Sequence, residues 1–228
     1  MLKSLLINEK EWEAFFLSEQ ALTISPKGKF SLNDIHQAFR VLEGAGIAGL
    51  VDIIPAYESI ALIFEGIVHE LSDAVDEIQQ AIKQVDINEF ETNTIEVPVC
   101  YKFGLDWEEV EANTALPQKE IIEIHSSGTY TVSMMGFQPG FLYLSGLHEA
   151  LSCPRKTNPR TKIPAGSVGI GGSQTGIYAL ESPGGWQIIG RTPKHFFDVL
   201  SNPPIQIRPG DRVRFTPITE QQFTEWED

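Results

Sequence analysis

The sequence predicts two units, a small α+β unit followed by a unit built mainly of short β-strands. In residues 1–93, apolar residues recur at helical spacing in two segments that alternate with strand-like runs. In residues 136–193, by contrast, the chain gathers eleven of its nineteen glycines and six of its fourteen prolines. Because glycine permits positive φ and proline removes a backbone donor, this region must form turns and short strands rather than helices.

The first unit, residues 1–93, is expected to hold a sheet and two helices. Its elements are strands at Lys3–Asn8 and Ala14–Leu17, a helix from Ser31 to about Glu43, strands at Leu50–Pro55 and Ser59–Glu65, and a helix at Leu71–Gln84. Ser31 is a favourable N-cap for the first helix, and Gly44 and Gly46 end it. Two helices beside a four-stranded sheet predict a ferredoxin-like α+β sandwich.

A polar stretch at Asp86–Thr94 without periodicity is the expected linker to the second unit, residues 94–228. There the predicted elements are a strand at Thr94–Tyr101, helices at Leu105–Thr114 and Pro117–His125, and strands at Thr129–Phe137, Ser167–Ile170, Gly176–Leu180, Trp186–Arg191 and Arg212–Pro217. Short strands between turn signals favour a barrel or a sandwich.

Composition excludes several classes of protein. The chain of 228 residues has a net charge of −14, which argues against a nucleic-acid partner, because such proteins neutralise phosphates with clustered Lys and Arg. No run of about 18 apolar residues predicts a membrane span. The two cysteines form no disulfide framework, which favours the cytoplasm. The five histidines show no pair at metal-ligand spacing, so no metal site is predicted.

One segment is basic within this acidic chain. Residues 152–195 carry six basic side chains against the single acid Glu181. This local charge suits a small anion such as a carboxylate or phosphate. Arg155 and Arg160 bracket a proline-containing loop, and Arg191 follows at the end of the segment; a guanidinium can hold a carboxylate with two hydrogen bonds. The alternative is that these are solvated loop charges.

Two motifs in this segment imitate known catalytic loops. Gly169–Gly176 is rich in glycine, but it lacks the Gly-Lys-Ser/Thr ending of a P-loop, and no long helix follows it. Ala165–Gly169 approaches the nucleophile elbow around Ser167, yet strands are expected on both sides of it. Both are therefore better explained as turns of the β-scaffold.

Four further side chains are candidates for the site. His125 stands where a helix passes into a strand, which suits either general acid–base catalysis or an ordinary helix-terminal histidine. Gln174, Tyr178 and Glu181 follow one glycine-flanked strand and its exit. Trp186 is either a core residue or a wall on which a ligand stacks. From the residues alone, the prediction is a basic, aromatic pocket on a β-scaffold.

Three motifs carry a resemblance to a known family. These are GFQPGFLYLSGL (136–147), PRKTNPRTKIPAGSVGIGGSQTGIYALESPGGWQIIGRTP (154–193) and PGDRVRF (209–215). They resemble the family of the B subunit of 5-oxoprolinase, also called allophanate hydrolase subunit 1, which includes the Kip-type inhibitor of a sporulation sensor kinase. Members of the family usually have a proline where this chain has Leu142.

The resemblance implies a ferredoxin-like N-terminal domain and a cyclophilin-like C-terminal barrel. It also implies a complex with subunits C and A that opens the lactam of 5-oxoproline to L-glutamate with ATP, which contacts this chain, its partner or both. In that reaction Arg155, Arg160 and Gln174 would stabilise negative charge and His125 would transfer protons. The family allows two other functions, namely inhibition of a histidine kinase and the processing of urea or allophanate.

Overall fold

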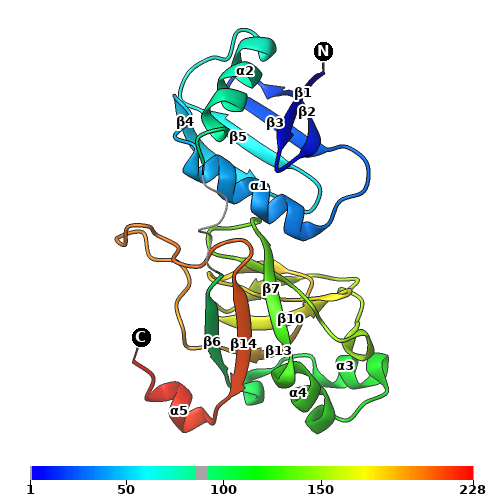
Figure 1. Ribbon diagram of the computed structural model, residues 1–228. Helices are drawn as coiled ribbons and strands as arrows, with labels where there is room; N and C mark the ends of the chain where they lie inside the picture. Colours follow the sequence, from blue (N-terminus) through cyan, green and yellow to red (C-terminus); the bar gives the residue numbers. More distant parts are fainter. Residues whose placement is uncertain (1, 86–91, 228) are drawn as a thin grey trace. The chain divides into compact units, whose positions relative to one another are not determined.

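The computed structural model describes residues 2–85 and 92–227 and divides the chain into two compact units, Met1–Glu91 and Thr92–Asp228 (Figure 1). Most of the predicted linker at 86–94 lies outside the described residues. The protein is a mixed α and β structure dominated by sheets. No helix in the two described ranges is both long enough and apolar enough to cross a bilayer.

The first unit is an antiparallel sheet of five strands in the order β1-β2-β3-β5-β4, with two helices packed against it. Its elements are β1 (Lys3–Ile7), β2 (Lys10–Ser18), β3 (Ala21–Pro26), α1 (Leu32–Gly44), β4 (Leu50–Pro55), β5 (Ile60–Phe64) and α2 (Leu71–Ile82). Both predicted helices are present. The carboxylate of Asp34 accepts a hydrogen bond from the Ser31 backbone N–H at 2.7 Å, which confirms Ser31 as the N-cap of α1.

The strand β3 was absent from the sequence-based prediction, although it occupies the middle of the sheet. It pairs with β2 on one side and with β5 on the other. Leu22 and Ile24 on it are buried in the same apolar cluster as the inner faces of α1 and α2, and Ala21 is buried as well. A central strand buried on several successive residues shows no clear alternation, so the period-two pattern of a strand was missing. The sheet therefore has five strands instead of the predicted four.

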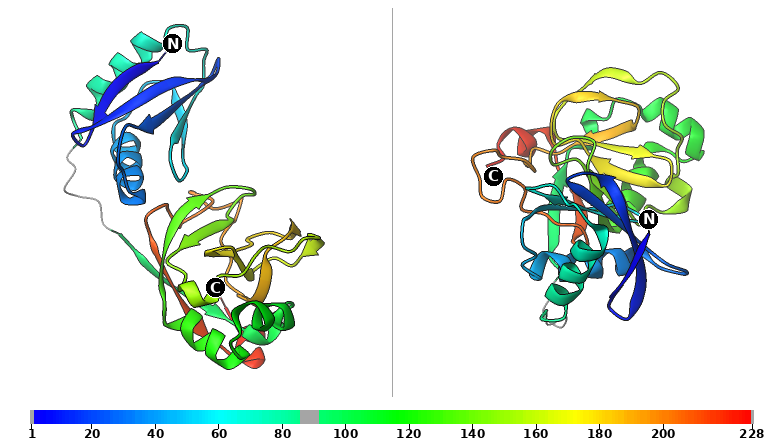
Figure 2. Two further views of the ribbon diagram at one scale, coloured as in Figure 1. Left: turned by 90° about the vertical axis from the view of Figure 1, so that its right-hand side faces the viewer. Right: turned by 90° about the horizontal axis from the view of Figure 1, so that it is seen from above.

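The second unit contains a curled sheet of seven strands in the order β13-β10-β11-β8-β7-β14-β6 (Figure 2). The strands are β6 (Thr94–Val99), β7 (Thr129–Met135), β8 (Leu142–Ser145), β10 (Ser167–Gly171), β11 (Gln174–Ile177), β13 (Gln187–Arg191) and β14 (Arg212–Pro217). Only β14 and β6 run parallel. Two hydrogen bonds between Cys100 and Arg191 join the ends of the sheet order, so the sheet curls back toward itself as in a barrel.

Helices and a small two-stranded sheet accompany this sheet. They are α3 (Trp107–Thr114), α4 (Gln118–Ser127), α5 (Glu220–Thr224) and the paired strands β9 (Arg160–Ile163) and β12 (Ser182–Gly184). The predicted helices and most predicted strands are confirmed. The strand expected at Gly176–Leu180 begins earlier, at Gln174, because Gly172 at φ +67° makes a tight turn that returns the chain beside β10.

Candidate functional site

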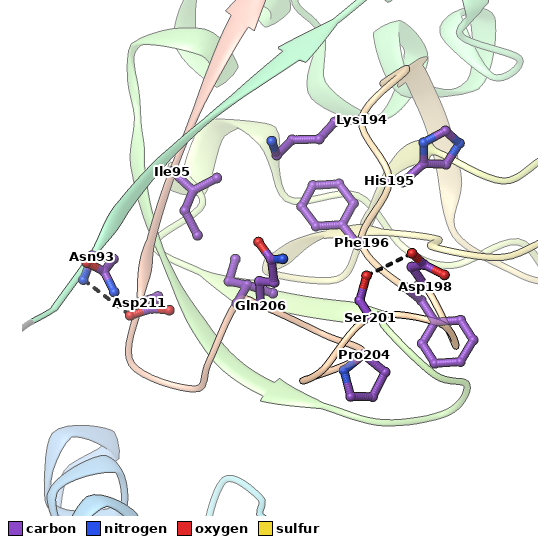
Figure 3. Close-up of a pocket in the computed structure, with 12 residues that line it drawn as sticks. Asn93, Ile95, Lys194, His195, Phe196, Asp198, Ser201, Pro204, Gln206 and Asp211 are labelled. Carbon is purple, nitrogen blue, oxygen red and sulfur yellow. Dashed lines mark hydrogen bonds between the residues drawn. The ribbon is translucent and has the colours of Figure 1, made fainter. Parts of the chain in front are cut away.

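One cavity in the second unit, the Lys194 pocket, has a volume of about 780 Å³ (Figure 3). That volume lies within the range of small-molecule sites. The pocket forms between the start of β6 and the loop that precedes β14. Its lining residues are Asn93, Ile95, Lys194, His195, Phe196, Phe197, Asp198, Ser201, Pro204, Gln206, Ile207 and Asp211.

Hydrogen bonds fix the polar groups of the Lys194 pocket. Asp198 accepts a bond from the Leu200 backbone N–H at 2.9 Å and one from the Ser201 hydroxyl at 2.8 Å, and these bonds lower the pKa of its carboxyl. The Asn93 backbone N–H donates to the Asp211 carboxylate at 3.2 Å. None of the site residues predicted from sequence lines this pocket. The loop that forms it has no periodicity, so sequence patterns gave no signal for it.

A second cavity of about 290 Å³, the Arg155 pocket, lies beside α3. Its lining residues are Glu109, Asn113, Pro154, Arg155, Lys156, Thr157, Asn158 and Gln187. The guanidinium of Arg155 lies over the Trp186 ring, 5.3 Å from its centroid. This cation–π contact directs an exposed side chain along one surface of the molecule.

A buried carboxylate next to this pocket organises its charges. Asp106 accepts bonds from both terminal nitrogens of Arg160 at 2.6 and 2.7 Å, from Lys156 Nζ at 2.9 Å and from the Ile188 backbone N–H at 2.7 Å. Burial would raise the pKa of Asp106, but these bonds outweigh it and lower the pKa. Lys156 also pairs with Glu109. The expectation that Arg160 holds an external anion is therefore corrected, because it already holds a carboxylate of this chain.

His125 lies inside the barrel with no exposed surface. Its Nδ1 is 2.7 Å from the Tyr101 hydroxyl, its Nε2 is 2.9 Å from Thr175 Oγ1, and its ring stacks on Phe215. Thr175 Oγ1 donates to the Gly169 carbonyl, so it must accept from Nε2–H, and Nδ1 then accepts from Tyr101. Burial lowers the pKa of His125 to about 3. This neutral interior histidine cannot touch a substrate at the surface, which corrects the expected catalytic role.

Tyr178 and Trp186 belong to an aromatic cluster rather than to a ligand pocket. Both are buried, with Phe141 packed edge-on against each ring. Burial raises the pKa of Tyr178 to about 12. Trp186 is a core residue, and its ring also contacts the Arg155 guanidinium, whereas stacking against a ligand stays a prediction.

The remaining candidates are dispersed over the unit. Glu181 pairs with Lys162 at 3.0 Å on an exposed surface. Arg191 donates through Nε to the Ala165 carbonyl at 2.7 Å. Gln174 starts β11 and lines neither cavity. Of the predicted site residues, only Arg155 lines a cavity among those found in the described chain.

Comparison with known proteins shows which family this chain resembles in sequence. Residues 12–207 match the family model described as the carboxyltransferase domain, subdomain C and D. The B subunit of 5-oxoprolinase from Bacillus subtilis is 38% identical over 83% of this chain and 84% of its own length. That of Escherichia coli O157:H7 is 39% identical over 90% of this chain and 96% of its own length. This chain belongs to the family of 5-oxoprolinase B subunits.

A solved structure has a fold similar to that of this chain. The crystal structure of TTHA0988 superposes with a TM-score of 0.73 at 30% identity. The match covers 87% of this chain but only 40% of that one, so the family unit seen here forms a minor part of the longer protein.

The implied nucleotide does not fit a cradle in this chain alone. The glycine-rich segment before Gly176 forms the β10–β11 hairpin, with no helix N-terminus after it to face phosphate groups. The Lys194 pocket sets one lysine beside Asp198 and Asp211, a poor match for a triphosphate. No group of three or more His, Cys, Asp or Glu side chains within residues 2–85 and 92–227 could hold a metal ion.

Proposed function

We propose that this chain is the B subunit of an ATP-dependent 5-oxoprolinase, which opens the lactam of 5-oxoproline to L-glutamate together with subunits A and C. The observation that carries the proposal is the match to two proteins named as that subunit, at 38 and 39% identity over most of both chains. The three motifs on which the resemblance rests all fall in the second unit, whose curled sheet supports the cyclophilin-like barrel that the family implies. The ferredoxin-like description of the first unit remains a prediction.

The chemistry of this reaction explains why one subunit is not enough. A lactam carbonyl is a poor electrophile, so its opening requires activation and stabilisation of the negative charge that develops on the oxygen. The described residues of this chain provide small polar cavities but no triphosphate cradle. The proposal therefore assigns the nucleotide mainly to a surface that the partner subunits complete, and it predicts that this chain alone is inactive.

Reconstitution tests the proposal directly. The three subunits are purified separately, and glutamate release from 5-oxoproline is measured with ATP for the full mixture and for each mixture that lacks one of them. The expected result is activity in the full mixture and its loss when this chain is omitted. Unchanged glutamate release without this chain would refute the proposal.

Two alternatives remain predictions of the resemblance, namely docking on a histidine kinase and the processing of urea or allophanate. Both give outcomes that differ from the expected one. A kinase whose autophosphorylation falls when this chain is added, in a protein inactive toward 5-oxoproline, would favour the first. The location in the cytoplasm also remains a prediction.

A further inference from the structure

A buried hydrogen-bond acceptor without a partner lies at the wall of the Arg155 pocket. Gln187 is 4% exposed, and its Oε1 has no hydrogen-bond partner. The amide cannot be turned over to remove this deficit, because its Nε2 donates to the Pro154 carbonyl at 3.1 Å. Leaving such an acceptor unpaired is unfavourable, because the buried oxygen has lost its hydrogen bond to water without gaining another. A donor that reaches this oxygen would remove the deficit.

The same pocket holds a guanidinium that has not been used for an internal ion pair. Lys156 bonds to Asp106 and Glu109, and Arg160 bonds to Asp106. For Arg155 the described structure shows the Trp186 ring contact and no carboxylate partner. Stacking on the indole leaves the guanidinium N–H groups in its own plane, where they can reach a planar anion.

The charges around the pocket match a single negative charge. Two cations (Arg155 and Lys156) and one carboxylate (Glu109) line it, which leaves one positive charge in excess. The neighbouring pair of Arg160 and Asp106 adds no net charge. Because Lys156 is already paired with Glu109, a second negative charge on the ligand would have no further lining cation to pair with.

We infer that the Arg155 pocket binds a small monocarboxylate that carries an N–H donor, with the carboxylate on Arg155 and the N–H on Gln187 Oε1. A lactam such as 5-oxoproline has both groups on neighbouring atoms, and the cavity of about 290 Å³ is large enough for one small ring. This inference rests on the proposed function for the identity of the ligand. Of the residues expected from sequence it keeps only Arg155, and it adds Gln187.

Direct binding to the full chain separates the two contacts. Titrations followed by NMR use 5-oxoproline, L-glutamate, which adds a second carboxylate, and 2-pyrrolidone, which is the lactam without its carboxylate. We expect 5-oxoproline to bind more tightly than either. Arg155→Ala should weaken the binding of 5-oxoproline about tenfold or more, since a hydrogen-bonded charge is lost. The same substitution should leave the binding of 2-pyrrolidone unchanged.

Gln187→Leu should weaken the binding of both 5-oxoproline and 2-pyrrolidone, because it removes the oxygen that accepts the lactam N–H. Arg212→Ala is the matched control, since Arg212 is exposed on β14 and lines neither pocket. A thermal melt verifies that each variant is folded. If Gln187→Leu does not fold, the comparison of Arg155→Ala with Arg212→Ala decides alone.

The KM of the three-subunit enzyme distinguishes this inference from the proposed function. Glutamate release that requires this chain, with the KM and 5-oxoproline affinity of Arg155→Ala unchanged, would overturn the inference and leave the function standing. If the mixture releases no glutamate but 5-oxoproline binds this chain through Arg155, the proposed function is refuted and the inference stands. Failure of 5-oxoproline to bind this chain, both alone and within the complex, would also overturn the inference.

Discussion

The interior histidine of the barrel should make the stability of the second unit fall as the solution becomes acidic. Burial lowers the pKa of His125 from an ordinary value of 6.5 to about 3. The unfolded chain therefore binds a proton between these values that the folded chain rejects, so stability is complete above about pH 6.5 and is lost as the pH falls toward 3. At pH 5 the loss amounts to about 2 kcal/mol, from 1.5 pH units at about 1.36 kcal/mol each.

The measurement compares wild type with His125→Gln, which cannot titrate in this range. Hydrogen exchange of amides in the barrel strands, corrected for intrinsic rates, gives the free energy of opening for this unit at pH 7 and pH 5. Carboxylates contribute equally to the pH dependence of stability in wild type and in His125→Gln. The difference between the two pH dependences therefore reports the contribution of His125. His69→Gln, an exposed histidine in the first unit, should behave as wild type. Equal pH dependence in wild type and His125→Gln would refute the reasoning.

Three further substitutions test contacts around the candidate site. Asp106→Ala should destabilise the second unit by about 3–5 kcal/mol, because it leaves Arg160 and the Ile188 N–H without their buried partner. Glu109→Ala removes a half-exposed ion pair and should cost less than about 1 kcal/mol. Urea titrations of both variants check this, and similar losses would contradict it. Gly166→Ala should cost about 2 kcal/mol or more, since Gly166 has φ +79° and a Cβ there would collide with a backbone oxygen. A melting temperature of Gly166→Ala equal to that of wild type would contradict the predicted collision and backbone strain.

Local patterns carried the prediction of the elements. The helix α1 follows from apolar residues at helical spacing and from the Ser31 cap, both of which are visible within a few residues of sequence. The density of glycine and proline likewise indicated short strands and turns in the second unit. The strand β3 escaped because its burial comes from neighbours on both sides of the sheet, which local periodicity does not record.

The candidate site depended on contacts between distant residues. The basic segment around Arg160 looked unpaired because its partner Asp106 lies 54 positions away in the chain. His125 was interpreted as either a general acid–base residue or an ordinary histidine at a helix end. Its buried hydrogen bond to Thr175, 50 positions later, has no local sequence signal. Gln187 gave no signal at all, because an unpaired buried oxygen is defined only by the complete three-dimensional surroundings. Arg155 lines a cavity, and its role in binding an anion stays a prediction.

The parallel pairing of β6 with β14 has a consequence for how the second unit is made. These strands align along their whole length, and Glu96 on one bonds to Thr216 on the other, 120 positions apart. During translation β6 leaves the ribosome long before the strand that covers its edge. The emerging chain must hold an unpaired, apolar strand edge open through most of synthesis, which makes that interval the time of greatest exposure to misassociation.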